Sequence, residues 1–197
     1  MDFLNTLIDL RPVVDLGVRT MGLYKFEGKM PKIHPGAYVS PRASLIGDIE
    51  IGDGTSVWEF AVVRADMNKI RIGKNTSIQD NCTVHCTFLN PTIIGDLVTA
   101  GHNSVIHACE IGNQVVVGIG AIVLTGVKVG DGSVIGAGAV VTENTQIPPN
   151  SLVLGIPGKV IKEVPPDMHE SFKTDAELYV ELGKRHKRES DRSKPTK

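Results

Sequence analysis

The sequence has little charge imbalance, few aromatic residues and no long apolar run. Its 197 residues carry a formal net charge of −1, which argues against nucleic acid as a partner because phosphate binding needs a basic field. Aromatic residues make up only 5% of the chain, which suits a narrow core filled by Val and Ile. No run of about 18 apolar residues occurs, so we expect no transmembrane helix and no membrane partner.

Cysteine is also scarce. Cys82, Cys86 and Cys109 are odd in number and lack CxxC spacing, which predicts no disulfide framework. Reduced thiols favour a cytoplasmic location. The N-terminal stretch MDFLNTLIDLRP has an apolar stripe, but its acidic residues and the lack of a basic start argue against a signal peptide. We expect it to form either a short docking helix or a disordered extension.

The dominant pattern is an aliphatic residue that returns every six positions. Shorter runs of this pattern start at Ile33, Ile72 and Ile94, and the longest run comprises Ile111, Val117, Val123, Val129, Ile135, Val141, Ile147 and Val153. A period of six fits neither a helix nor a simple two-faced strand. It fits short strands joined by tight turns, three to a coil, and therefore predicts an all-β fold, a parallel β-helix shaped as a triangular prism.

Prolines and a helical pattern mark the end of the repeat. We place an N-terminal extension and lead-in at 1–30, the β-helix at 31–164, a C-terminal helix at 165–190 and a disordered tail at 191–197. Within the helical region, Thr174 to Glu177 has the pattern of a capping box. This pattern predicts a helix from about Asp175 to Arg188 that packs back along the prism.

Three histidines lie in the central part of the repeat. When successive units are assigned to the three faces in turn, His85 and His107 project outward from the first face, one coil apart. Neighbouring strands are about 4.8 Å apart, so two imidazoles can share one ion at Zn–N distances of about 2.0–2.1 Å. His102 falls on the third face, where the core separates it from the other two. The spacing therefore predicts a trimer in which a neighbouring chain supplies His102.

Other outward residues of the third face support an interface. Trp58 and Gln79 both follow inward aliphatic residues there, and a tryptophan on a prism wall is more typical of an interface than of a surface in water. Two intervals of the repeat, 63–72 and 84–94, are longer than six residues. Both begin beside the candidate residues, where functional loops are commonly carried on a rigid scaffold.

The strings VVRADMNKIRIG, SIQDNCTVH and GHNSVIH resemble the signature of the gamma-class carbonic anhydrases. These are hexapeptide-repeat proteins that form a left-handed parallel β-helix, and the resemblance covers roughly Tyr24 to Val164. It implies a Zn²⁺ ion held by His85 and His107 of one subunit and by His102 of the next, with CO2 and bicarbonate as substrates.

The resemblance also implies roles for four polar residues. Gln79 would hydrogen-bond the reacting water or bicarbonate, and Arg64 and Asp66 would form a polar pair at the subunit interface. Asp80 would be a carboxylate that interacts with a metal ligand without binding the metal itself. This sequence departs from the family at Met67, where active members carry a proton-transferring glutamate. Its loop CTFLNPT also lacks the second carboxylate.

The sequence thus favours zinc-dependent hydration of CO2 in a homotrimer, although Fe²⁺ or Co²⁺ could bind the same nitrogens. Two alternatives stay open. One is a coenzyme A-dependent acyltransferase or thioesterase built on the same prism, which needs no metal. The other is a metal-binding assembly subunit without catalytic activity.

Overall fold

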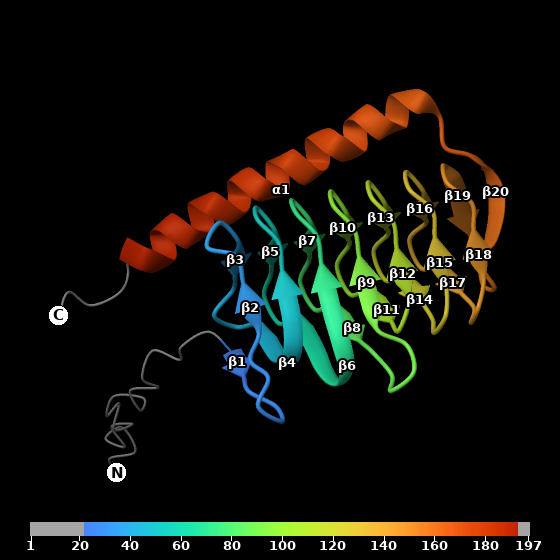
Figure 1. The fold of residues 1–197 in the computed structure, drawn as a ribbon. Coiled ribbons are helices and arrows are strands. Elements are labelled where there is room, and N and C mark those ends of the chain that lie inside the picture. Colours follow the sequence, from blue (N-terminus) through green and yellow to red (C-terminus); the bar gives the residue numbers. More distant parts are fainter. Residues whose placement is uncertain (1–21, 193–197) are drawn as a thin grey trace, which may run out of the picture.

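The computed structural model describes residues 22–192, which wind as a parallel β-helix with one long helix, α1 (Pro166–Arg192), along its side (Figure 1). The strands stack on three faces, because β4 (Ser44–Ile51) and β6 (Val62–Ile72) turn a corner and belong to two of them. The predicted fold class is confirmed.

Each face is a ladder of short strands. The first face contains the starts of β4 and β6 together with β1 (Gly22–Tyr24), β8 (Thr83–His85), β11 (Val105–His107), β14 (Ile122–Val123) and β17 (Val140–Val141). The second contains the ends of β4 and β6 together with β2 (Lys32–Ile33), β9 (Thr92–Ile94), β12 (Glu110–Ile111), β15 (Lys128–Val129) and β18 (Gln146–Ile147). The third contains β3 (Tyr38–Val39), β5 (Ser56–Val57), β7 (Ser77–Ile78), β10 (Thr99–Ala100), β13 (Val116–Val117), β16 (Val134–Ile135), β19 (Ser151–Leu154) and the antiparallel β20 (Lys159–Glu163).

The core is the column of repeat aliphatics inside the prism. Val63, Val84 and Ile106 of the first face are fully buried and pair in register, and the other repeat positions line the same core. Small buried side chains lie at the corners of the coil, where for example Thr76 Oγ1 donates to the Gly95 carbonyl at 2.8 Å. The period of six therefore acts as expected, because every unit brings one side chain inward.

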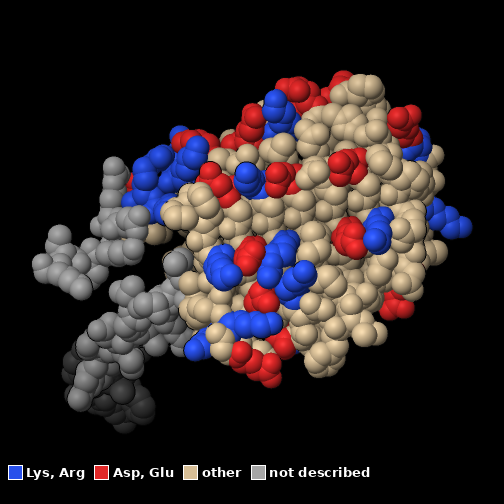
Figure 2. All heavy atoms as spheres, viewed as in Figure 1, with Lys and Arg blue, Asp and Glu red and all other residues tan. Residues whose placement is uncertain are grey.

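The second face carries charged side chains on its outside. Its outward side chains pair across neighbouring coils, as Arg71 does with Glu50 (3.2 Å) and Lys128 with Glu110 (3.1 Å). Figure 2 shows Lys and Arg side chains beside Asp and Glu side chains across the face that it views. Such solvated pairs contribute only about 0–1 kcal/mol each, but they mark this face as one that meets solvent.

Helix α1 covers the third face, where it contacts β3, β5, β7 and β10 (Figure 1). The approach is close at Gly183, since a Cβ there would lie 3.3 Å from the side chains of Tyr38 and Ser56. Trp58 lies beneath the helix, against Tyr179, with only 6% of its surface exposed. The prediction that Trp58 marks a subunit interface is therefore wrong: a helix of the same chain covers it.

Helix α1 (Pro166–Arg192) lies where the C-terminal helix was placed, at 165–190. It begins before Asp175, the start that the capping-box pattern predicts, because proline is well suited to a first helical turn and the helix continues through that pattern. Thr174 lies inside α1 and its Oγ1 donates to the Glu170 carbonyl at 2.9 Å. At the other end, the coil begins with β1, which pairs with β4 inside the predicted lead-in.

The expected N-terminal docking helix or extension lies outside the described residues, as does most of the predicted tail. In the part of the chain that is described, no helix is both long and apolar enough to cross a membrane.

Candidate metal centre

His85 and His107 occupy equivalent positions on adjacent strands of the first face. They are partners in the register of β8 and β11, and both rings project outward. Nδ1 of His85 lies 3.3 Å from Nε2 of His107. Two nitrogens bound tetrahedrally to one zinc at about 2.0–2.1 Å are themselves separated by about 3.3 Å. The two nitrogens therefore already have the spacing of ligands that share one ion.

The other nitrogen of each ring is held by a hydrogen bond. Nε2 of His85 lies 3.1 Å from Asp66 Oδ1, and Nδ1 of His107 lies 3.0 Å from Thr125 Oγ1. Partners of this kind set the tautomer and orientation of metal-binding imidazoles. Sequence reasoning missed Thr125, although it lies one coil beyond His107 in the repeat, and that spacing was the available signal.

The charged groups at this site favour an ionised carboxylate at Asp66 and a neutral imidazole at His107. Burial raises the pKa of Asp66, but hydrogen bonds from Arg64 and His85 outweigh it and leave that pKa below its usual value. Arg64 Nη1 lies 2.5 Å from Asp66 Oδ2, so the expected polar pair forms within one chain. The pKa of His107 is lowered by burial and then by His85 and Arg64. These effects favour the neutral form of the His107 ring, which is the form that binds a metal.

A second possible donor set overlaps the first. Donor atoms of Asp66, His85 and Cys86 lie within 4.8 Å of one another. However, the Cys86 side chain is buried, and its Sγ lies 3.3 Å from the Asn68 carbonyl. Burial raises the pKa of the Cys86 thiol, and metals bind the thiolate. The geometry therefore favours the two imidazoles as ligands and Asp66 as the support for one of them.

His102 lies apart from this pair, in the turn that follows β10 at the corner between the third and first faces. Its Nδ1 is 2.8 Å from Asp80 Oδ2, and its backbone N–H donates to Gln79 Oε1 at 3.2 Å. Asp80 therefore orients the ring and leaves Nε2 available to a ligand. Within residues 22–192, the structure brings two of the three histidines together and leaves the third at another corner.

Gln79 is held on the third face by helix α1. Only 4% of its surface is exposed, and its side chain forms a hydrogen bond with Tyr179. Burial and the nearby Asp80 carboxylate raise the pKa of Tyr179, and the hydrogen bond offsets part of this effect. Nothing in the sequence pattern singled out Tyr179, because only the docking of α1 brings it to Gln79.

Known proteins resemble the chain over most of its length. The model of the family "Bacterial transferase hexapeptide (six repeats)" matches residues 108–143. A "Probable carbonic anhydrase" of Methanocaldococcus jannaschii is 52% identical over 144 residues, which are 73% of this chain and 91% of that protein. The mitochondrial gamma carbonic anhydrase 2 of Arabidopsis thaliana is 38% identical over 84% of this chain, which spans 62% of that longer protein.

Solved structures share the fold. A hexapeptide transferase family protein from Anaplasma phagocytophilum superposes with a TM-score of 0.79 at 34% identity, covering 82% of this chain and 96% of that one. The BC4754 gene product of Bacillus cereus gives a TM-score of 0.82 at 36% identity, covering 84% and 96%. The same coil thus occurs in proteins named for two kinds of chemistry.

Proposed function

The chain belongs to the gamma-class carbonic anhydrase family, and from this premise we propose that it hydrates CO2 reversibly at a Zn²⁺ ion shared between subunits of a homotrimer. Membership makes it a carbonic anhydrase-like enzyme. The observation that carries the metal proposal is the 3.3 Å separation of the His85 and His107 nitrogens. The hydrogen bonds of Asp66 and Thr125 support the same orientation of the two rings.

Three neutral imidazoles would hold a Zn²⁺ ion and leave one position open to water, whose pKa the ion would lower to about 7. His85 and His107 of one subunit supply two of the nitrogens. His102 of a neighbouring subunit supplies the third through Nε2, since Asp80 holds its Nδ1. Fe²⁺ and Co²⁺ accept the same ligands, so the residues define the site more closely than they define the metal.

Of the three faces, the first is the one available to pack against a second copy of the chain. Charged side chains cover the second face and α1 covers the third. The first face instead presents a partly exposed apolar stripe, formed by Val62, Val105, Ile122, Leu124 and Val140. Burial of such a stripe against the corner that carries His102 of a neighbour would complete the ligand set, and apolar patches of this kind are common at the core of homo-oligomer interfaces.

The remaining polar residues act on the reacting molecules or on the ligands. The family resemblance assigns to Gln79 a hydrogen bond with the reacting water or bicarbonate. Because its side chain lies under α1 and its Oε1 accepts the His102 N–H, Gln79 would act from the neighbouring subunit, beside His102. Arg64 places bicarbonate by its charge, while Asp66 and Asp80 orient one histidine each. Preorganised donors of this kind are effective because they need no rearrangement during the reaction.

Proton release is the step for which this chain lacks a side-chain relay at the family's positions. Met67 stands at the first relay position and is partly exposed. The loop after His85 exposes Phe88 and Leu89, two apolar side chains, at the second. The proton therefore passes to solvent or buffer, and we expect modest turnover at low buffer concentration.

Subunit mixing tests the shared site. A His85→Ala trimer and a His102→Ala trimer each lack every complete ligand set. Random exchange between them should rebuild about a quarter of the sites. A complete site needs a His102→Ala chain, which supplies His85 and His107, beside a His85→Ala chain, which supplies His102, and random pairing gives this order at about one interface in four. Metal content, mass in solution and CO2 hydration should all follow this mixing. A zinc-loaded monomer, or exchange without recovered metal, would contradict the proposal.

Acyl transfer is the second candidate, favoured by the structural likeness to a hexapeptide transferase family protein. Incubation with acetyl-CoA and detection of the released thiol separates the two reactions, since a zinc-loaded trimer without acyl-CoA turnover excludes transfer. Intact zinc without hydration at any buffer concentration would instead favour the assembly subunit. The cytoplasmic location stays a prediction.

A further inference from the structure

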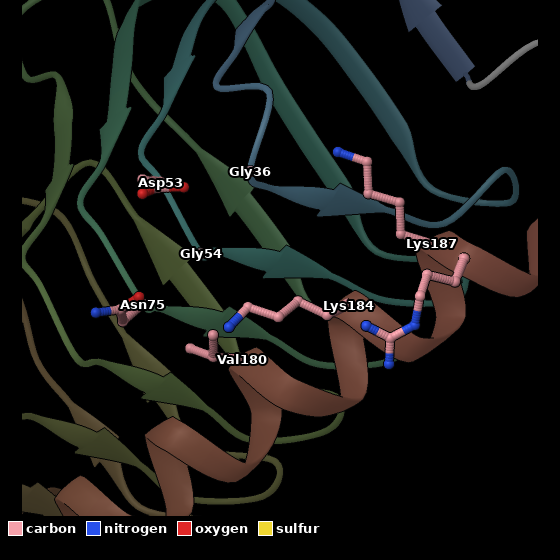
Figure 3. Close-up of a pocket in the computed structure, with 8 residues that line it drawn as sticks. Gly36, Asp53, Gly54, Asn75, Val180, Lys184 and Lys187 are labelled. Atoms are coloured by element: carbon pink, nitrogen blue, oxygen red, sulfur yellow. The ribbon is translucent and has the colours of Figure 1, made fainter. Parts of the chain in front are cut away.

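A cavity of about 420 Å³ lies between α1 and the corner that joins the second and third faces (Figure 3). The turns at Gly36, Gly54 and Asn75 line it on the side of the coil. The histidine pair lies on the first face, so this cavity is separate from the candidate metal centre. Its volume falls within the range of about 300–1,000 Å³ that is usual for small-ligand sites.

The helical wall of this cavity is basic. Lys184, Lys187 and Arg188 line it together with Val180, at spacings that place all four on one face of α1. Figure 3 shows Lys184 extending from the helix toward the Asn75 turn. Figure 2 shows Lys and Arg side chains gathered over this end of α1. The chain as a whole carries a slight negative charge, so the positive charge here comes from where the basic residues lie and not from an excess of them in the sequence.

These cations are only weakly neutralised by the protein. Lys184 has no acidic partner among the described residues. Arg188 reaches Glu181 at 3.4 Å, a long contact between two largely exposed side chains. Lys187 Nζ donates to the carbonyls of Pro35 and Ala37, which are neutral acceptors that leave its charge uncompensated.

The opposite wall offers hydrogen-bond donors. In the coil that follows Gly54, the backbone N–H of Asn75 donates to the Asp53 carbonyl at 2.8 Å. Unlike the equivalent amides of the later coils, the Gly54 backbone N–H forms no hydrogen bond with another residue in the described range 22–192. Gly54 has a φ of +67°, and a Cβ there would lie 2.1 Å from Asn75 Oδ1, so glycine is needed for the Asn75 side chain to cover this turn.

The charge balance of the lining favours an anion. Among the lining residues, Asp53 alone is acidic, and its Oδ1 lies 3.0 Å from His34 Nδ1. Cations in the last turns of a helix also complement the helix dipole. That effect accounts for basic residues on α1, but it does not account for the unpaired Gly54 amide that faces them.

We propose that this cavity binds a diphosphate group, either as free inorganic pyrophosphate or as part of a nucleoside diphosphate. Lys184 and Arg188 neutralise the charge of the phosphates, and the Gly54 amide donates a hydrogen bond to one of their oxygens. A diphosphate satisfies several converging donors, whereas bicarbonate or a single phosphate satisfies fewer. The proposal requires neither the metal nor hydratase activity.

Titration of the 197-residue protein with pyrophosphate, ADP, AMP and inorganic phosphate tests this site by calorimetry. Pyrophosphate or ADP should bind saturably, one per chain, at least tenfold more tightly than phosphate or AMP. Tighter binding of ADP than of pyrophosphate would identify the nucleotide as the ligand, and the reverse order would identify the inorganic anion.

Substitutions then locate the site. Lys184→Gln combined with Arg188→Gln should weaken diphosphate binding at least tenfold, whereas Lys162→Gln combined with Lys173→Gln removes the same charge elsewhere and should change it less than twofold. Asn75→Asp, which preserves side-chain size, should also abolish binding, and Asp53→Asn should strengthen it. CO2 hydration should stay at the parent level in the Lys184/Arg188 variant.

Equal losses in the two double variants would overturn the proposal, because they would show a general charge effect. Absence of saturable binding at millimolar pyrophosphate would overturn it as well. Failure of CO2 hydration in the parent protein would leave this result unchanged, so the two proposals fail separately.

Discussion

Replacing Thr125 by valine should weaken zinc binding about tenfold while the β-helix remains folded. The substitution keeps the branched shape and removes the Oγ1 atom that lies 3.0 Å from His107 Nδ1. Partners that orient a metal-binding histidine typically contribute about 10–100-fold in metal affinity. Thr125 is only partly buried, so water can replace its hydroxyl, and we expect the lower end of that range, about 1.4 kcal/mol.

The same reasoning ranks a second variant. Asp66→Asn removes a charged acceptor that holds both His85 and Arg64, so its effect should approach 100-fold. Zinc competition against a chromophoric chelator measures both affinities, and thermal unfolding of the metal-free proteins checks the fold. Thr83→Val is the matched control, since Thr83 is exposed on the same face and should leave zinc affinity unchanged. An unchanged affinity in Thr125→Val would refute the proposed orientation of His107.

Three further predictions concern proton transfer, acid stability and thiol reactivity. Met67→Glu should raise steady-state CO2 hydration at low imidazole concentration and change it much less at high concentration, as stopped-flow assays would show. A gain that does not depend on the buffer concentration would show instead that the substitution acts on the metal site and not on proton transfer. Hydrogen bonds from Lys29 and Arg71 outweigh burial and lower the pKa of Asp48, so this carboxylate stabilises the fold above about pH 4 and loses that contribution as pH falls through its folded-state pKa. Asp48→Asn should therefore cost about 1 kcal/mol at pH 7 and nothing in strong acid, as urea unfolding at both pH values would reveal. Burial raises the pKa of Cys109 to about 12, so the native protein should resist a thiol reagent at pH 8 that labels it rapidly once unfolded.

The sequence by itself determined the coil and the position of its first-face histidines. Both follow from a local period: an inward residue at every sixth position places Val84 and Ile106 in the core, and the next residue of each strand then projects outward. Because parallel strands of equal length stack in register, His85 and His107 had to lie side by side. The spacing alone does not determine the hand of the coil, which the family resemblance supplied.

The tertiary structure decided what covers each face. Docking of α1 on the third face buried Trp58 and brought Tyr179 to Gln79, contacts between segments so distant in sequence that no periodicity relates them. It also overrode the capping-box pattern at Thr174, since packing along the prism stabilises a longer helix than the local signal indicates. The cavity lined by Lys184 exists only because this helix lies beside the first turns of the coil. Local repetition thus specified the solenoid, while long-range packing of one amphipathic helix determined which of its surfaces remain open.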